Sequence, residues 1–449
     1  MKAFAHHFIW LLLVAAPAAS AQYSYTTNAD GLTCTITGHL GSDGAMIIPT
    51  NIDGLTVVSI GESAFAGTIV NSGNLGEILP NYIPVTVEIP GTVTNVGAGA
   101  FMLCDNLASV TVSGSVSSLG VSAFNGCYSL SNVSLSAGLT SIGASALADC
   151  PNLAGLVLPG TVASIGDQAF ASTGLTNLAI PAGVTNLALD AFFNCHSLGA
   201  LTVDPGNPVY GSTQGVVFDH GRTTLLLCPP GFTGSCAVPG GVTQIGSSAF
   251  NGCCFLISVT LPVGLTTIGD EAFEGCYDLT NVTLPDGVAS IGYSAFADCT
   301  ALPNITIPAS VTSLANAAFA VCGQLTQACF AGNAPATNIM VFFDAPVTCF
   351  YLPGATGWGS AFDQAPTAPW LLPYPVILKN GPGLGAQTGG FGFTISWATN
   401  LPVVVQACGN LASPAWSPVA TNLLVGGTSR FTDPQWTNYP SRFYRLRSP

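Results

Sequence analysis

Residues 279–299 read LTNVTLPDGVASIGYSAFADC, and this stretch decides the fold of the chain. Leu279, Val282 and Leu284 stand among polar residues, which predicts a short strand with one apolar face. Pro285 and Gly287 follow at once, and this pair is typical of a turn. A second apolar face comes next, and an Ala-Phe-x-x-Cys segment closes the stretch. The pattern predicts a coil with an aromatic residue at its centre.

Copies of this stretch recur along the chain. An Ala-Phe pair, once Ala-Leu, occurs ten times, and six of the nine intervals between successive pairs are 23 residues. One coil buries about five side chains, a gain of roughly 8–15 kcal/mol. Fixing its backbone costs more, at roughly 1–2 kcal/mol per residue, so coils must stack to be stable. The sequence therefore predicts a repeat solenoid with a ladder of short parallel strands. The pairs end at Phe65, Phe101, Phe124, Leu147, Phe170, Phe192, Phe250, Phe273, Phe296 and Phe319.

The repeats resemble the BspA-like leucine-rich repeats of bacteria. The shared pattern is a Leu-x-x-Val-x-Leu-Pro strand, then Val-x-x-Ile-Gly, Ala-Phe, and finally Cys and Leu, and it covers about Ile47 to Phe330. The resemblance implies a curved solenoid that is secreted or displayed at the cell surface and serves in binding or adhesion. It implies no catalytic residues. Leu147 in place of Phe and Thr173 in place of Cys are departures within single coils.

Five segments are expected along the chain. Residues 1–21 read as a signal peptide, because Lys2 precedes a short apolar run and the small-residue cleavage site Ala19-Ser20-Ala21. No later apolar run is long enough to span a membrane, so we expect an exported protein, extracellular or at the cell surface. The remaining segments are an N-terminal cap hairpin at 22–46, the solenoid at 47–330, a C-terminal cap at 331–370 and a small β-sandwich-like module at 371–449.

Two insertions break the period of the solenoid. The first lies near 68–84, and the second lies near 204–238, between two repeat cysteines. In the second insertion, two apolar runs flank the turn 219–222, which predicts a β-hairpin. We interpret this hairpin first as architecture. Its His220 and Arg222 remain candidate contact residues.

The module at 371–449 has its own pattern. Phe391, Phe393, Ile395 and Trp397 alternate with small or polar residues, which predicts a half-buried strand in a small all-β fold. We cannot assign this module to a family from its residues. Its tryptophans are expected mainly in the core, although aromatic residues on such modules also form sugar platforms. The candidates for that second role are Trp416 and Trp436.

Fifteen cysteines occur in the chain, and eight of them share one position of the repeat. Stacked equivalents lie about 4.8 Å apart, which is farther than the usual Cβ separation in a disulfide. We therefore expect a buried ladder of free thiols. Candidate bridges are Cys228–Cys236 and Cys329–Cys349, and Cys254, next to a ladder cysteine, is a candidate reactive thiol. The ladder consists of Cys104, Cys127, Cys150, Cys195, Cys253, Cys276, Cys299 and Cys322.

Charge excludes one class of partner. Residues 22–370 hold 20 acidic residues and one cation, whereas 371–449 hold five cations and one acid. Nucleic-acid binding needs a basic face, which seven cations in the whole chain cannot supply. The simpler interpretation of this charge asymmetry is that the acidic body favours solubility and the tail surface is variable. The more specific interpretation is that the basic tail is attracted to the acidic body or to another anionic surface.

No motif in the sequence predicts chemistry. His39, His196 and His220 lie in different segments, and no spaced His or Cys set indicates a metal site. Cys195-His196 suggests a nucleophile, but Cys195 belongs to the buried ladder. We therefore expect no enzyme, cofactor or metal. The leading hypothesis is a binding or adhesion scaffold for a protein or glycan. The alternatives are a self-associating structural protein of the envelope or matrix, and the targeting subunit of a secreted hydrolase.

Overall fold

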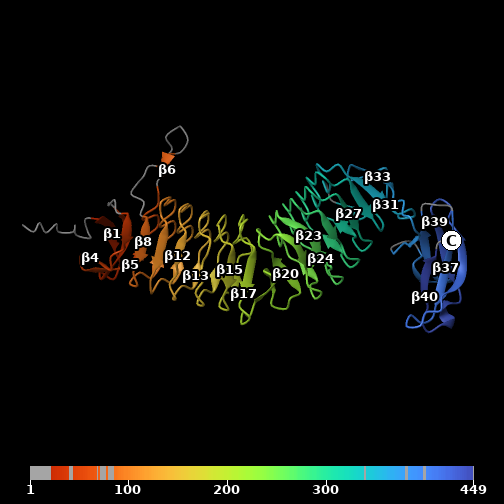
Figure 1. The fold of residues 1–449 in the computed structure, drawn as a ribbon, viewed down its shortest axis with the longest axis horizontal. Helices are drawn as coiled ribbons and strands as arrows, with labels where there is room; N and C mark the ends of the chain where they lie inside the picture. The colour runs from red at the N-terminus through yellow and green to blue at the C-terminus, as the bar shows by residue number, and fades with distance from the viewer. Residues whose placement is uncertain are drawn as a thin grey trace, which may run out of the picture. The chain divides into compact units, whose positions relative to one another are not determined.

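The computed structural model describes residues 22–39, 44–67, 69–70, 77–78, 85–337, 340–379, 383–397 and 401–447 (Figure 1). The predicted signal peptide and most of the first insertion lie outside these residues. The chain divides into two compact units, Met1–Thr173 with Asn186–Ala191, and Gly174–Thr185 with Phe192–Pro449. No helix among the described residues has the length and apolar character needed to cross a membrane.

The first unit stacks its coils through two ladders of short strands. Strands β1 and β2 form an antiparallel hairpin, and parallel pairing continues from β2 through the coils. One ladder runs β1 (Tyr23–Thr27), β2 (Thr33–His39), β5 (Leu55–Ile60), β9 (Asn95–Val96), β11 (Ser118–Leu119), β13 (Ser141–Ile142), β14 (Ser164–Ile165) and β16 (Asn186–Leu187), with β4 (Asn51–Ile52) on β5. The other runs β3 (Ala45–Ile47), β8 (Thr86–Ile89), β10 (Ser109–Val112) and β12 (Asn132–Ser134), and β6 (Ile69–Val70) pairs with β7 (Glu77–Ile78).

The second unit repeats this arrangement in its solenoid part. Strand β15 (Asn177–Ile180) pairs with β17 (Ala200–Val203), and β21 (Gly234–Ala237), β23 (Leu256–Thr260) and β25 (Asn281–Thr283) form a parallel ladder. A longer ladder runs β18 (Tyr210–Thr213), β19 (Val216–Asp219), β20 (Thr224–Leu227), β22 (Gln244–Ile245), β24 (Thr267–Ile268), β26 (Ser290–Ile291), β28 (Ser313–Leu314) and β30 (Ala336–Thr337). The last runs β27 (Asn304–Ile307), β29 (Gln327–Phe330), β31 (Thr348–Tyr351), β33 (Ala365–Pro369) and β32 (Ala361–Phe362).

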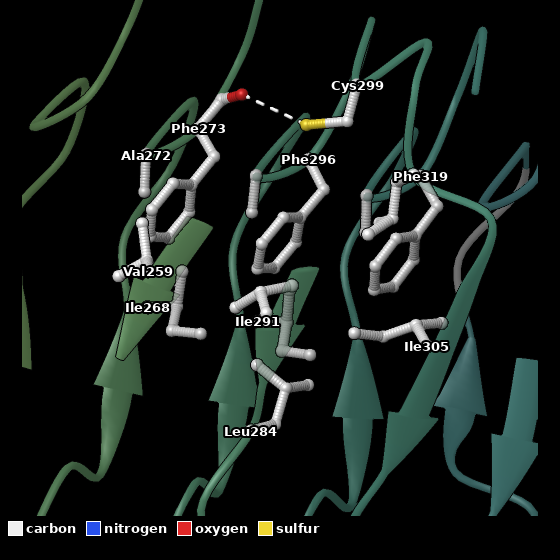
Figure 2. Close-up of a cluster of buried hydrophobic side chains, with 14 of the residues drawn as sticks. Val259, Ile268, Ala272, Phe273, Leu284, Ile291, Phe296, Cys299, Ile305 and Phe319 are labelled. Atoms are coloured by element: carbon white, nitrogen blue, oxygen red, sulfur yellow. Dashed lines mark hydrogen bonds between the residues drawn. The ribbon is translucent and has the colours of Figure 1, made fainter. Parts of the chain in front are cut away.

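The repeated phenylalanines form the axis of the core. Figure 2 shows Phe273, Phe296 and Phe319 pointing the same way from successive coils, with aliphatic side chains beneath them. The ring centroids of Phe273 and Phe296 lie 4.9 Å apart, and those of Phe296 and Phe319 lie 5.2 Å apart, in stacked geometry. Each ring therefore covers the next, and the rings have no access to water.

Glycine sets how closely the coils approach. A Cβ atom added at Gly120 would lie 2.6 Å from the backbone carbon of Gly97 in the preceding coil. From Phe101 onward, the residue two places after the central Phe or Leu of a coil has a left-handed φ, which is +69° at Gly252 and +57° at Asn194. Glycine and asparagine tolerate that conformation best, and this explains the Gly-Cys and Asn-Cys pairs of the repeat.

The stacking continues past the last Ala-Phe pair. Phe342 stacks on Phe319 with ring centroids 5.6 Å apart, and Val341 stands where the other coils have Ala. A search for Ala-Phe pairs passes over this coil because of that one substitution. Coil geometry therefore extends into 331–370, the segment expected to serve as a cap.

All strand pairs in the described part of the C-terminal module are antiparallel. One sheet holds β34 (Val376–Ile377), β35 (Gly385–Gln387), β36 (Gly390–Ser396) and β39 (Thr428–Asp433), and the other holds β37 (Pro402–Cys408), β38 (Ser417–Leu423) and β40 (Phe443–Arg447). A 3-10 helix spans Trp436–Asn438. Phe393, Ile395, Trp397 and Phe431 are among the side chains of its core. The predicted fold class, a β-rich repeat solenoid followed by a small all-β domain, is confirmed.

Candidate binding surfaces

The insertion hairpin presents His220 and Arg222 at an exposed turn. Nδ1 of His220 lies 3.1 Å from the backbone oxygen of Asn207, so the ring is tied to the underlying loop. Arg222 has a φ of +54° and its side chain is exposed. The carboxylate of Asp219 accepts hydrogen bonds from the backbone N–H of Thr224 and the hydroxyl of Thr223, which fixes the turn. The hairpin strands belong to the ladder of the solenoid, and the turn between them carries one exposed cation.

Trp416 and Trp436 are each half-buried in the module. The guanidinium carbon of Arg445 lies 4.5 Å from the ring centre of Trp416. Trp436 packs against Phe391 at 5.9 Å between ring centres. Both rings already have partners within the module, so each offers only part of its surface to a ligand.

The cysteine ladder has a hydrogen-bonding role that its sequence pattern did not reveal. The Sγ atom of Cys299 donates to the backbone oxygen of Phe273 at 3.2 Å, as Figure 2 shows. Cys276 and Cys322 make the same bond to the phenylalanine of the preceding coil, at 3.2 and 3.1 Å. Burial raises the pKa of these thiols well above the usual value for Cys276 and Cys299, and to about 12 for Cys322. These three thiols are therefore protonated donors that join one coil to the next.

Neither candidate disulfide is formed. All fifteen cysteines lie within the described residues, and all are free thiols. Cys329 pairs in register with Phe350, and Cys349 pairs with Ala328. Side chains alternate along a strand, so the two cysteines point to opposite faces. Cys228 and Cys236 are both buried and also unbridged.

One group of exposed side chains lies at the turn that follows the ladder cysteine. We define the turn patch as His196, Cys254, Phe255 and Tyr277. Phe255 is 42% exposed and Tyr277 is 51% exposed. Sγ of Cys254 lies 3.6 Å from Nδ1 of His196, and the rings of His196 and Phe255 meet edge to face, with 6.5 Å between their centres. The patch combines two aromatic rings, an imidazole and a thiol.

Local backbone geometry turns these side chains outward. The backbone N–H of Cys254 donates to the oxygen of Gly252 at 2.8 Å, and that of His196 donates to Asn194 at 3.0 Å. These tight turns follow the left-handed residue of the repeat. Tyr277 occupies the same repeat position as Cys254, because their strands pair in register with Ser258 opposite Asn281.

Electrostatics at the patch are acidic. Partial burial raises the pKa of the Cys254 thiol, and the negative charge of Asp278 adds to that rise. In the same coil, burial and the charges of Glu271 and Asp298 raise the pKa of Glu274. Among the described residues, no three His, Cys, Asp or Glu side chains are grouped as a metal site would need.

The pairing of His196 with Cys254 could not be found in the sequence. Neighbouring coils normally place residues 23 apart in contact, whereas these two residues are 58 apart. The inserted coil brings them together, because Gly231 donates to Leu198 on one side and Gly234 donates to Phe255 on the other. Cys195, the sequence neighbour of His196, is buried in the ladder, and the thiol beside the imidazole is that of Cys254.

Comparisons with known proteins agree with this architecture. The family described as BspA type leucine rich repeat region matches in six copies, over residues 84–199 and 235–357. A leucine rich cell surface protein of Faecalibacterium prausnitzii is 27% identical, with a TM-score of 0.57 over 76% of this chain and 94% of that one. The pneumococcal vaccine antigen PcpA is 20% identical, with a TM-score of 0.55 over 74% and 91%.

A leucine-rich repeat protein of Eubacterium ventriosum is also 20% identical, with a TM-score of 0.50 over 77% of this chain and 97% of that one. These two more distant structures share the fold. No curated protein matches the chain. Because the family profile covers more than half of the sequence and its repeats coincide with the stacked coils, the chain belongs to the BspA type leucine-rich repeat family.

Proposed function

We propose that this protein is a non-catalytic, exported binding scaffold that uses the turn patch to engage a protein or glycan at a cell or matrix surface. Membership in the family and the likeness to a cell surface protein of F. prausnitzii support this role. A rigid array of coils is suited to it, because each coil fixes the position of the side chains that it exposes.

The observation that carries the proposal is the exposure of aromatic rings at one site. Phe255 and Tyr277 each expose about half of their surface on neighbouring coils. Aromatic side chains are enriched at the centres of protein interfaces and stack on sugar rings. His196 and Asp278 supply polar groups beside them, which a ligand needs for orientation.

A binding panel tests this proposal. The fluorescently labelled chain from Gln22 onward is applied to a glycan array, to immobilised matrix proteins and to whole cells. The variant Phe255→Ser/Tyr277→Ser is expected to bind at least about tenfold more weakly than the parent, because it lacks both anchors.

The matched control is Tyr128→Ser. Tyr128 is 48% exposed and occupies the same turn position in a coil of the other unit. Retained binding by this control and loss in the double variant support the patch. Equal binding by parent and double variant, or no binding of the parent to any surface, contradicts the proposal.

Self-association is a second candidate, favoured by the charge asymmetry. The body holds 20 of the 21 acids, and the module holds five of the seven cations. Arg445 and Arg447 lie on β40, which pairs in register with β37. Both side chains occupy exposed positions of β40. Attraction between the basic module and the acidic body of a second copy would weaken as salt rises. Sedimentation velocity at low and high salt separates this candidate from the first.

A further inference from the structure

Cys254 differs from every other cysteine in the protein. The other fourteen are buried, whereas the Cys254 side chain is partly exposed. Its Sγ atom lies 3.6 Å from Nδ1 of His196, within the range of a hydrogen bond to sulfur. The pair joins a potential nucleophile to a group that accepts a proton.

Two features of the fold constrain this pair. The inserted coil passes between the two residues at Gly231, where an added Cβ atom would lie 2.6 Å from the backbone oxygen of His196. The absence of a side chain at Gly231 lets the two layers approach. The edge-to-face contact with Phe255 sets the plane of the imidazole ring. The backbone therefore brings His196 and Cys254 to the same face, and the Sγ–Nδ1 contact joins their side chains.

We propose that Cys254 and His196 form a thiol–disulfide exchange site that takes cationic aliphatic disulfides. This activity goes beyond the proposed binding role and does not depend on it. In the neutral tautomer with hydrogen on Nε2, His196 accepts the thiol proton at Nδ1. The sulfur of Cys254 then attacks one sulfur of the disulfide R–S–S–R.

The exchange balances without an added oxidant. The bond from Cys254 Sγ to the R–S sulfur forms as the S–S bond of the reagent breaks. The second sulfur leaves as a thiolate and takes the proton from His196, so one R–SH is released for each mixed disulfide. The sulfur of Cys254 is oxidised from thiol to disulfide, and the leaving sulfur keeps the two electrons of the broken S–S bond and is reduced to a thiol.

The charge around the site selects the disulfide. Asp278 directly follows Tyr277, which occupies the position of Cys254 in the next coil, and the body of the protein is strongly acidic. A cationic group on the reagent is attracted to this surface, whereas a carboxylate is repelled. The effect of one charge near a protein surface corresponds to a preference of about fivefold or more at low salt.

The experiment compares cystamine, which is cationic, with 3,3′-dithiodipropionate, which is anionic, on the native chain. Adducts are counted by intact mass, and each rate is divided by that of N-acetylcysteinamide with the same reagent, which cancels the difference in leaving group. We expect one adduct per chain, absent in Cys254→Ser, and a normalised rate about fivefold higher for cystamine that falls with added salt. Equal normalised rates overturn the cationic assignment.

Two variants test the role of His196. His196→Gln keeps the size of the side chain and is expected to lower the normalised rate at least about tenfold. Cys254→Ser/Tyr128→Cys places a thiol at the same turn position of another coil, where Tyr128 makes the equivalent backbone hydrogen bond at 3.0 Å. That thiol should react at the slow rate of His196→Gln.

Three results overturn the proposal. They are no adduct on the native chain, a His196→Gln variant as fast as the parent, and a thiol at position 128 as fast as Cys254. The buried thiols report on folding in every sample, because an unfolded chain takes more than one adduct. A variant with a single adduct and an unchanged rate is therefore folded, and its result counts against the role of His196.

Discussion

The solenoid and the C-terminal module bury their aromatic rings in different ways. In the solenoid, Phe296 stacks on one ring from the coil before it and one ring from the coil after it. In the module, Phe393 meets Phe431 and Tyr444, which come from two other strands, in tilted and edge-to-face contacts. Removing a ring from the solenoid should therefore weaken the contacts between neighbouring coils, whereas removing a ring from the module should weaken the whole domain.

The two regions also differ in their cysteines. Fourteen of the fifteen precede the module, and the ladder thiols hydrogen bond from coil to coil. The module holds Cys408 alone. Stacking in the solenoid therefore depends on thiols that must remain protonated, whereas the module has no such ladder.

The largest expected effect comes from Phe296→Ala, which removes one ring from the solenoid stack. A fully buried phenylalanine leaves a cavity that its neighbours cannot fill, at a cost of about 3–5 kcal/mol. Urea unfolding followed by far-ultraviolet circular dichroism should show an earlier loss of strand signal. In a Trp358→Phe/Trp370→Phe background, which leaves tryptophans of the chain from Gln22 onward only in the module, the fluorescence should keep its midpoint.

The control for this change is Tyr293→Ala in the same coil. Tyr293 is 49% exposed, so its loss should shift the midpoint by less than about 0.5 kcal/mol. If the tryptophan fluorescence shifts together with the strand signal in Phe296→Ala, the two regions unfold as one body. That outcome breaks the comparison.

Alkaline pH should lower the stability of the solenoid before that of the module, and this is the second largest expected effect. Burial raises the pKa of Cys236 to about 11 and that of Cys322 and Cys349 to about 12, from 9.0. In the unfolded chain these thiols ionise near pH 9.0, while the folded chain keeps them protonated. The stability they contribute is fully present below pH 9 and is lost as pH rises toward 11–12. Each thiol costs about 1.4 kcal/mol per pH unit, so the three together cost about 4 kcal/mol at pH 10.

The module should resist the same change for one further pH unit. Burial and a hydrogen bond to the carboxylate of Asp433 raise the pKa of Tyr444 from 10.0 to about 12. The sign is the same, but the loss begins only above pH 10. Urea midpoints measured from pH 8 to pH 11 with both optical probes check the order. A module that weakens before the solenoid contradicts this assignment.

Sequence periodicity predicted the solenoid well because one residue type dominates each position of a coil. The phenylalanine axis, the glycine at the coil contact and the ladder cysteines all follow from the 23-residue spacing. The coil with Val341-Phe342 was not predicted, because the search pattern required Ala before the phenylalanine. Stacking of the rings needs only a small or medium-sized apolar residue at that position.

The turn patch was beyond periodic reasoning for a physical reason. His196 and Cys254 meet across an inserted coil, and nothing in the spacing states how far that insertion moves the layers apart. The backbone oxygens that accept hydrogen bonds from the ladder thiols were not predicted either, because a sequence pattern does not specify where carbonyl groups point. Trp416 directly precedes β38 and Trp436 begins the 3-10 helix, and their partners Arg445 and Phe391 come from other strands, so the sequence could not show how much of each ring is covered.

A smaller effect is expected from Gly120→Ala, which sharpens the comparison at the coil contact. The new Cβ atom would meet the backbone of the preceding coil at 2.6 Å, so the coils must separate at that point. Overpacking of this kind costs about 1–3 kcal/mol.

The control is Gly160→Ala, whose Cβ atom meets nothing within 4 Å. It should leave the urea midpoint unchanged or raise it slightly, since alanine restricts the unfolded chain. Equal losses in the two variants contradict coil spacing as the cause.

The smallest effect concerns Trp416 and Arg445, which pair on the surface of the module. A cation over an aromatic ring at an exposed site contributes about 0.5–1 kcal/mol. Trp416→Ala alone also removes packing, and Arg445→Gln alone also disturbs the hydrogen bond to Gln406, so neither single variant isolates the contact. The double variant does, because the coupling energy from thermal unfolding retains only the shared term. A coupling near zero would mean that the ring and the cation lie together without stabilising the module, and Trp416 would then be free to stack on a ligand at no cost to the fold.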